Sequence, residues 1–583
     1  MKKAWIKIST IWMVLVFMMI PIEAKVTEAI IDITGMSIKE IQEQVDLGMI
    51  SYQEITQIYL DRIAAYAELY DVVISVNPNA IEEAAALDVQ YQETGRTSDV
   101  FGIPILVKDN IDVKGMPTTA GATGLFDNYP KEDADVIKSL RDKGVIFIAK
   151  TNMDEFAFNA SFSRSGFGTV KNAYNTLYSA YGSSGGTAAG VALDLAVAGL
   201  GTDTGTSIRV PASANNLYGL RPTKESVSTD GIIKFEFLRD MVGPMTKYAD
   251  DAKLLYEAMA NVSISLDLED LTGITVGVLS SQVNASSGFI RELFEKKINQ
   301  LEALGATIKY VSSFSMSYSF NSGNFCYDFN QHIKNTEGPI GSLNDLIRSG
   351  KYTQYISGYS GYYCEHDYTK TDAFKQYLSA HNNNIVRANN QFNSLGVDVL
   401  VYPTIQEPLM TLDKALYNNV KTYSYMIAPQ TGFPSISVPM GFYEDLPYGM
   451  EIVSQSSRDD LLLEMASLLE NHYVLPDAVG ALYTPIEEIP SLLDILDTTH
   501  LEIEYEPVIT AIQGFIDNYS DVEDKSKVAQ SLIEEYEDVP RIIEENIRIA
   551  RAKKIHTYAI VGVSIVGLIV IIYIVKRKTR KYY

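Results

Sequence analysis

The feature that most constrains this chain is a run of small residues from Tyr181 to Pro211, YGSSGGTAAGVALDLAVAGLGTDTGTSIRVP. Glycine at this density lets backbone approach other backbone or a ligand closely. Two serines, Ser183 and Ser207, stand in glycine-lined turns of the run, and we expect them to be exposed. On its own, such a stretch is also typical of a close-packed turn and helix without chemistry.

A lysine at the end of an apolar segment points to chemistry. The segment FGIPILVKDN places Lys108 directly after the apolar residues 103–107, so we expect a buried side chain. A serine hydroxyl needs a base to take its proton, and lysine is such a base when burial lowers its pKa. Backbone N–H groups of residues 204–207 could stabilise the oxyanion of acyl transfer. The residues therefore predict a serine nucleophile activated by a neutral lysine.

In these residues the chain resembles the amidase signature family, in which a lysine, a serine in a cis peptide bond and a nucleophilic serine form a triad. The resemblance implies that Lys108 is the lysine, Ser183 the bridging serine and Ser207 the serine that forms the acyl-enzyme. It also implies backbone contacts with the substrate at Ala157, Thr204, Gly205 and Thr206.

Two flanking residues and two departures qualify the resemblance. Asp203 and Arg209 fall on motif positions beside the nucleophile, where we expect them to brace the turn. Tyr181 stands where the family usually has glycine, and Thr206 stands where it often has another. Either side chain would be strained at a positive φ. A catalytically impaired binding protein on the same scaffold is therefore an alternative.

The resemblance extends over roughly residues 35–475 through segments such as KTNMDEFAF, GLRPT, DMVGP and DVLVYPT. It implies an α/β fold with a mixed central β-sheet covered by α-helices, and hydrolysis of a carboxamide C–N bond. The segment TNMDEF also suggests a transamidase-like subunit for transfer-RNA charging. The export and anchoring that we expect oppose this alternative, because its substrate is cytosolic.

Other chemistry is weakly indicated. Residues 182–186 match G-x-S-x-G, the nucleophile elbow, but the preceding KNAYNTLYSAY is a polar loop where the elbow needs a hydrophobic strand. The six histidines never fall at metal-ligand spacing, and no phosphate-binding G-x-x-x-x-G-K-[ST] run occurs. We therefore expect no metal and no organic cofactor. The net charge of −25 argues against a nucleic-acid partner.

The two ends predict export and anchoring in the cell membrane. Residues 1–24 carry three lysines before the apolar IWMVLVFMMIPI, which is typical of a signal peptide, with an uncleaved anchor as the alternative. Residues 557–575 include a charge-free run of about 27 Å as a helix, long enough for a transmembrane helix. The basic tail, residues 576–583, then lies in the cytoplasm. The protein would span the membrane once, with its catalytic domain extracellular.

Between these ends we expect a catalytic domain over residues 25–490 and an acidic helical stalk over residues 491–556, for which a partner-binding module is the alternative. Cys326 and Cys364 could form one bridge or remain two buried thiols. The expected substrate is a small-molecule or peptide amide. The acidic surface favours neutral or cationic amides. No pattern indicates an oligomeric state.

Overall fold

The computed structural model describes residues 31–470 and 476, apart from 320, 322, 354, 355, 360–363 and 423–426. The expected signal, stalk, transmembrane and tail segments lie outside the described residues, at 1–24, 491–556, 557–575 and 576–583. Within the described part, no helix has both the length and the apolar character needed to cross a bilayer.

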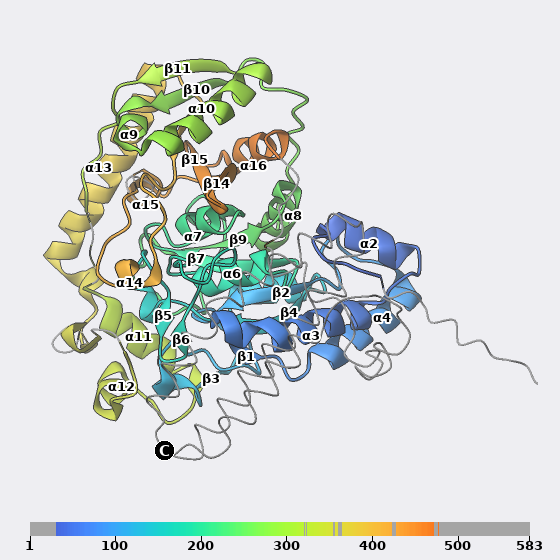
Figure 1. Ribbon diagram of the computed structural model, residues 1–583. Coiled ribbons are helices and arrows are strands. Elements are labelled where there is room, and N and C mark those ends of the chain that lie inside the picture. The colour runs from blue at the N-terminus through green and yellow to red at the C-terminus, as the bar shows by residue number, and fades with distance from the viewer. Residues whose placement is uncertain are drawn as a thin grey trace, which may run out of the picture.

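A mixed sheet of eleven strands forms the centre of the fold (Figure 1). In spatial order its strands are β1 (Val73–Val76), β4 (Ile146–Thr151), β2 (Pro104–Lys108), β7 (Ala198–Asp203), β9 (Met241–Thr246), β8 (Tyr218–Arg221), β14 (Ser435–Tyr443), β15 (Leu446–Ser454), β13 (Val399–Pro403), β10 (Thr275–Leu279) and β11 (Thr307–Val311). Strand β2 is parallel to β4 and β7, and β10 is parallel to β11 and β13. The other pairs are antiparallel, which confirms the expected mixed sheet.

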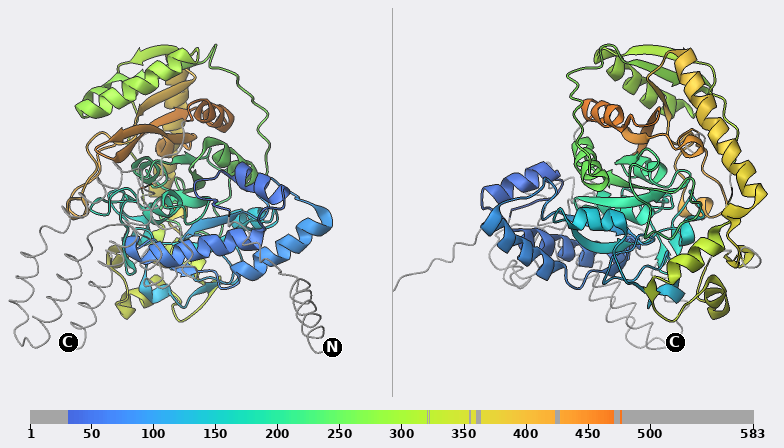
Figure 2. Two further views of the ribbon diagram at one scale, coloured as in Figure 1. Left: turned by 45° about the vertical axis from the view of Figure 1, so that its right-hand side comes forward. Right: turned by 180° about the vertical axis from the view of Figure 1, so that it is seen from behind.

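Helices cover this sheet, as Figures 1 and 2 show. They are α2 (Ile38–Asp46), α3 (Tyr52–Tyr70), α4 (Ala80–Thr94), α5 (Asp135–Arg141), α6 (Gly185–Ala192), α7 (Arg209–Ala214), α8 (Ala249–Ala260), α9 (Ser280–Ala285), α10 (Gly288–Ala303), α11 (Phe325–Ile333), α12 (Leu343–Ser349), α13 (Asp372–Leu395), α14 (Leu412–Ala415), α15 (Ala428–Thr431) and α16 (Asp459–Leu468). Short 3-10 turns are η1 (Thr123–Leu125), η2 (Glu155–Ala157), η3 (Ile356–Tyr359) and η5 (Tyr368–Lys370). Two small sheets pair β3 (Tyr129–Pro130) with β12 (Thr336–Glu337), and β5 (Arg164–Ser165) with β6 (Gly168–Thr169).

The small-residue run becomes the buried helix α6 and the buried strand β7. Every residue of α6 is buried, and the helix packs against β2 and β7. A Cβ added at Gly190 would lie 2.6 Å from Leu106 Cδ1, so a larger residue there would require this leucine side chain to shift. Strands β2 and β7 are buried along their whole length, as in sheets covered on both faces. The close packing expected of this run is therefore present, and it sets the positions of the turns at either end of α6.

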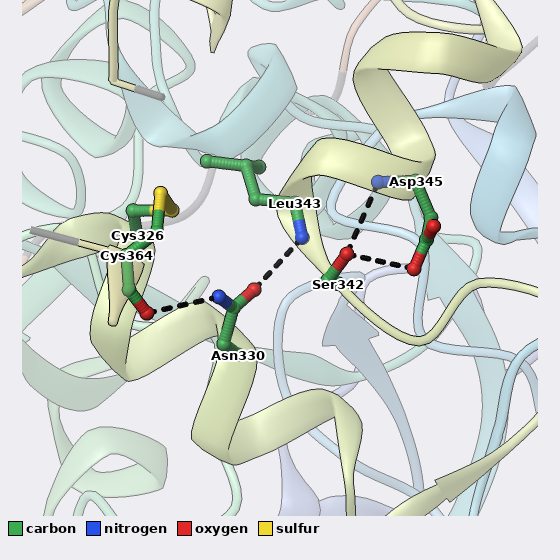
Figure 3. The surroundings of a disulfide bond; sticks show 6 residues. All are labelled: Cys326, Asn330, Ser342, Leu343, Asp345 and Cys364. Carbon is green, nitrogen blue, oxygen red and sulfur yellow. Dashed lines mark hydrogen bonds between the residues drawn. A yellow bond between two sulfur atoms is a disulfide. The ribbon is translucent and has the colours of Figure 1, made fainter. Parts of the chain in front are cut away.

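Helices α11 to α13 lie outside the sheet, with α13 running along one side of the molecule (Figure 2, right). Cys326 and Cys364 are joined by a disulfide with a Cα–Cα distance of 4.7 Å, which decides between the bridge and the two free thiols. Asn330 on α11 donates to the Cys364 carbonyl (3.2 Å) and accepts from the Leu343 amide (2.8 Å), as Figure 3 shows. The bridge thus ties the segment around Cys364 to α11 and the start of α12.

Candidate active site

Lys108 is the last residue of β2, and its side chain is completely buried, as the sequence predicts. Its Nζ lies 2.7 Å from Ser183 Oγ and 2.8 Å from Thr202 Oγ1, with the Thr202 carbonyl oxygen at 3.3 Å. Asn110 Nδ2 donates to the same threonine hydroxyl at 3.1 Å. The amine is therefore held between two hydroxyls and a carbonyl oxygen.

Burial sets the protonation state of this amine. Taking the ammonium out of water penalises its charged form and lowers the pKa of Lys108 to about 7. Nearby carboxylates raise the pKa but do not offset burial; in decreasing order of effect they are Asp203, Asp240 and Asp154. A large fraction of Lys108 is therefore neutral at physiological pH.

Ser183 stands in a tight turn directly before α6. The Gly182–Ser183 peptide bond is cis, as the family resemblance implies for this serine. A Cβ added at Gly182 would lie 2.1 Å from the Phe162 carbonyl oxygen, so no other residue fits there without displacing the backbone. The Ser183 carbonyl accepts a hydrogen bond from the Asp154 amide at 3.1 Å. These contacts fix the turn that points the Ser183 hydroxyl at Lys108.

The φ of Tyr181 is 61°, so this residue adopts the left-handed conformation in which a non-glycine side chain is strained. Its side chain is fully buried, and its hydroxyl accepts a hydrogen bond from the Met410 amide at 2.8 Å. Packing and this hydrogen bond offset part of the strain of a left-handed non-glycine residue. Thr206 is not among the residues with positive φ, so its departure from glycine brings no such strain.

Ser207 lies in the turn between β7 and α7 and is only 5% exposed, while Ser183 is fully buried. The expectation that both serines are exposed was therefore wrong, because the turns lie beneath the surface between α6, α7 and the sheet. The Ser184 amide donates to the Ser207 carbonyl at 3.2 Å and joins the two turns. Within the described residues the Ser207 hydroxyl makes no hydrogen bond. Lys108 and Ser183 thus touch directly, and Ser207 occupies the adjoining turn.

The backbone around Ser207 offers donors without acceptors. The amides of residues 204–207 donate to no group in the described part of the chain. Such a set of neighbouring free N–H groups suits an oxyanion. The amide of Ala157, in contrast, donates to the Asp154 carbonyl at 2.8 Å. Of the positions expected to contact substrate, Thr204, Gly205 and Thr206 have available N–H groups, whereas Ala157 does not.

A buried ion network holds the Ser207 turn, as expected for Asp203 and Arg209. Arg209 Nε contacts Asp203 Oδ2 at 3.1 Å, and Arg221 Nη1 contacts Asp203 Oδ1 at 3.0 Å. Burial alone would raise the pKa of Asp203, but Arg209 and Arg221 outweigh it and lower the pKa to about 2. Arg209 Nη1 also contacts Glu451 Oε1 at 2.5 Å on β15. The turn is therefore anchored to β15, which lies four strands from β7 in the central sheet.

Comparison with known proteins identifies the family. The Amidase family model matches residues 54–463. The chain belongs to the amidase signature family. It is 30% identical over 496 residues to a glutamyl-tRNA(Gln) amidotransferase subunit from Caldanaerobacter subterraneus subsp. tengcongensis, covering 77% of this chain and 99% of that relative. It also resembles the native peptide amidase from Stenotrophomonas maltophilia, with a TM-score of 0.65, 28% identity, and coverage of 76% and 99%.

An amidase family protein from Bacillus anthracis gives a TM-score of 0.67 at 27% identity, covering 76% of this chain and 92% of that structure. Amidase signature proteins act on amide carbon–nitrogen bonds, so this chain is an amidase. The individual roles of Lys108, Ser183 and Ser207 stay predictions. So do the substrate contacts at Ala157, Thr204, Gly205 and Thr206 and the domain boundaries at 25 and 490.

Three residues of this amidase signature site were missed in the sequence. Thr202 contacts the lysine amine, Asn110 donates to the Thr202 hydroxyl, and Asp240 Oδ1 accepts from the Thr204 hydroxyl at 2.5 Å. Asn110 stands two residues after Lys108, and Asp240 is the first residue of the DMVGP segment. Both residues therefore lie in sequence segments that carry the family resemblance. Thr202 is recognisable only once β2 and β7 are known to lie side by side.

Proposed function

We propose that this amidase is anchored in the cell membrane and hydrolyses an extracellular carboxamide through an acyl-enzyme on Ser207. The observation that carries the chemistry is the 2.7 Å contact between Lys108 Nζ and Ser183 Oγ inside a fully buried pocket of hydroxyls. A buried amine with a lowered pKa and no carboxylate in contact is suited to accept a proton.

Lys108 Nζ lies within hydrogen-bond distance of three oxygen atoms, which are Ser183 Oγ, Thr202 Oγ1 and the Thr202 carbonyl oxygen. In the neutral amine of the proposed reaction, two N–H groups donate to the Thr202 oxygens, and the lone pair is then free to accept the proton of the Ser183 hydroxyl. Ser183 then takes the Ser207 proton as Ser207 Oγ attacks the substrate carbonyl carbon. The pair therefore forms a two-step path from the nucleophile to the base.

The acyl-enzyme forms and breaks in balanced steps. Attack gives a tetrahedral intermediate, whose oxyanion accepts hydrogen bonds from the free amides of residues 204–207. The C–N bond breaks as Lys108, through Ser183, returns the proton to the leaving amine. Water then attacks the acyl ester, gives its proton to the same pair, and releases the carboxylic acid with restoration of the Ser207 hydroxyl.

Several observations support the extracellular location. Disulfides persist in oxidising compartments, and the Cys326–Cys364 bridge is buried in the catalytic body. The signal-like residues 1–24, the apolar span 557–575 and the basic tail 576–583 predict export with one crossing. A stalk over residues 491–556 would join the body to this span. A peptide amidase among the structural relatives favours a small-molecule or peptide amide as substrate.

The relatives that are glutamyl-tRNA(Gln) amidotransferase subunits favour a second candidate, in which this chain is one component of an amidotransferase. A component of that kind acts with partner proteins and in the cytosol. The net charge of −25 opposes contact with a polyanionic RNA, and the predicted export opposes the compartment. Turnover of simple amides by the chain alone favours the amidase, whereas turnover only with added partner proteins favours this second candidate.

Labelling with a serine-directed fluorophosphonate tests the nucleophile. We expect rapid labelling of the full chain, none of Ser207→Ala, and unchanged labelling of Ser213→Ala, a buried control serine on α7. An amide library then identifies turnover. Equal labelling of Ser207→Ala and wild type would refute the assignment. No labelling and no turnover of the folded wild type would instead favour the binding-protein alternative.

Protease treatment of intact cells tests the topology separately. We expect the protease to remove the catalytic body while an epitope placed after Tyr583 survives inside the cell. If the catalytic body is protected and the epitope is lost, the proposed orientation is wrong, and the substrate is then not extracellular.

A further inference from the structure

Three aromatic side chains that the proposed reaction does not use pack against one another. Phe158 follows Ala157 at the end of η2, Phe235 lies in the loop between β8 and β9, and Phe325 is the first residue of α11. The ring centroids of Phe158 and Phe235 are 4.7 Å apart, and those of Phe158 and Phe325 are 5.3 Å apart. The remaining pair, Phe235 and Phe325, is separated by 6.2 Å. Together the three rings form one aromatic wall.

Hydrogen bonds place this wall next to the backbone donors of the candidate active site. The Phe235 amide donates to Asp240 Oδ2 at 2.7 Å, and the other oxygen of this carboxylate accepts from the Thr204 hydroxyl. At the start of the same loop, the Ile233 amide donates to the Asn110 carbonyl at 2.9 Å, two residues after the lysine of the site. The loop that carries Phe235 is therefore bonded at both ends to the segments that form the site.

The wall has a covered side and an accessible side. Phe325 is 1% exposed, and its ring packs edge-on against Phe156, which is 2% exposed, with 5.8 Å between the ring centroids. Phe158 and Phe235 are partly exposed instead, so a molecule in the site can touch their rings. Accessible aromatic rings beside a few polar groups are the usual lining of a site for small organic molecules.

A disulfide fixes the covered side of the wall. Cys326 directly follows Phe325, and its bridge to Cys364 ties the start of α11 to a segment 38 residues further along the chain. Asn330 on the same helix donates to the Cys364 carbonyl at 3.2 Å and adds a second tie, as Figure 3 shows. The helix end that carries Phe325 is therefore restrained behind the two accessible rings.

We infer that Phe158 and Phe235 bind a large apolar group of the amide substrate, such as an aryl ring. The Cys326–Cys364 bridge is a positioning element, because it holds Phe325 behind these two rings. The inference rests on the proposed function and names the substrate class of the same site. An aryl ring on this wall is removed from water and packs edge-on or offset against the phenylalanines. A charged group there would lose its hydration without a partner from these side chains.

Steady-state kinetics with matched pairs of amides test the inference on the full chain. 3-Phenylpropanamide and propanamide differ by a ring on the acyl side of the scissile bond, and N-benzylacetamide and N-methylacetamide differ by a ring on the amine side. The preference for the ring is the ratio of the two kcat/KM values in a pair. We expect a preference of at least about tenfold in one pair, because even a single buried methylene contributes about tenfold or more. The pair that shows it identifies the side that the wall contacts.

Replacement of the accessible rings should lower this preference. In Phe158→Ala and Phe235→Ala we expect kcat/KM for the ring-bearing amide to fall about tenfold more than that for the small amide, mainly through KM. Phe442→Ala is the matched control, because its ring near the end of β14 is also partly exposed and lies 5.3 Å from that of Tyr174. It should keep the wild-type preference. Cys326→Ser/Cys364→Ser should lower the preference as well, because Phe325 is then less restrained.

Equal losses on both amides of each pair in Phe158→Ala and Phe235→Ala would overturn the inference and leave the proposed reaction intact. A wild type that turns over the amides without any preference for the ring would do the same. If the alanine variants fail to fold, an unchanged preference in Phe158→Leu and Phe235→Leu overturns it instead. An unchanged preference in the folded double serine variant would remove the role of the bridge.

Calorimetry separates this inference from the proposed reaction, because binding needs no turnover. If the wild type turns over none of the four amides, its affinity for 3-phenylpropanamide and N-benzylacetamide is compared with that of Phe158→Ala. Binding of one of them that is about tenfold weaker in the variant supports the wall, even where absent fluorophosphonate labelling refutes the Ser207 reaction. Equal binding by wild type and variant, or no binding by either, overturns the inference.

Discussion

Two lysines on neighbouring strands of the central sheet are equally buried, and both contact hydroxyl and carbonyl oxygens, but only one of them has a carboxylate in contact. Lys108 on β2 contacts two hydroxyls and a carbonyl oxygen, whereas Lys150 on β4 forms an ion pair with Asp109 at 3.2 Å. Val107 is the cross-strand partner of Lys150, so the two lysines point to opposite faces of the sheet. Burial without a carboxylate partner gives a base, and burial with one gives a structural cation.

The largest effect should follow from removing the base. In Lys108→Met we expect kcat/KM to fall about 10⁴-fold, equivalent to about 5.5 kcal/mol, because the proton of Ser207 then has no acceptor. Stability should not fall. The pKa of Lys108 drops from 10.5 to about 7 on folding, so at neutral pH the buried amine opposes folding and its removal relieves that cost.

Steady-state kinetics and thermal unfolding measure these two quantities. Lys108→Arg serves as the control for shape and charge, and it should be as inactive as Lys108→Met because arginine does not lose its proton. Wild-type turnover by either variant would remove the lysine from the mechanism.

The second effect concerns stability. In Lys150→Met we expect the free energy of unfolding to fall by about 3–5 kcal/mol, because Asp109 is left as a buried carboxylate without its cation. Denaturant unfolding measures the loss, and the double variant Asp109→Asn/Lys150→Met should recover part of it. A single variant as stable as wild type would show that the two lysines do not differ as described. The folded fraction should retain kcat.

The third effect is the pH dependence of the reaction. The neutral amine is the active form, and the pKa of Lys108 is about 7, so activity should reach a plateau above that pH. Below it, kcat/KM should fall about tenfold per pH unit, which corresponds to about 1.4 kcal/mol, as the amine becomes protonated. A pH–rate profile between pH 5 and 9 measures the midpoint. An activity optimum near pH 5 would indicate a carboxylate or histidine base instead.

The same contrast shows what the sequence could and could not predict. The apolar run before Lys108 indicated its burial, and the small residues around Ser183 and Ser207 indicated the turns. Thr202 gains its role only through the pairing of β2 with β7, and such long-range contacts leave no local pattern. The Cys326–Cys364 pairing remained open for the same reason, since a separation of 38 residues does not fix a distance. The arrangement of the mixed sheet came from the family resemblance alone.

The smallest effect should come from the hydroxyl that holds the base. Thr202 Oγ1 lies 2.8 Å from Lys108 Nζ and accepts one of its N–H groups, and this acceptance stabilises the charged amine more than the neutral one. In Thr202→Val the shape is nearly kept and the acceptor is lost. We therefore expect the pKa of Lys108 to fall further, and the midpoint of the pH–rate profile to move to lower pH, with a modest loss of kcat at the plateau.

The matched control for this shift is Thr151→Val, because Thr151 is the buried cross-strand neighbour of Lys108 and its hydroxyl bonds to Thr187 at 2.7 Å. Its pH midpoint should equal that of wild type. A midpoint that moves to higher pH in Thr202→Val would mean that the threonine favours the neutral amine. In that case the contact with the Thr202 hydroxyl would not account for the difference between Lys108 and Lys150, whose burial is equal.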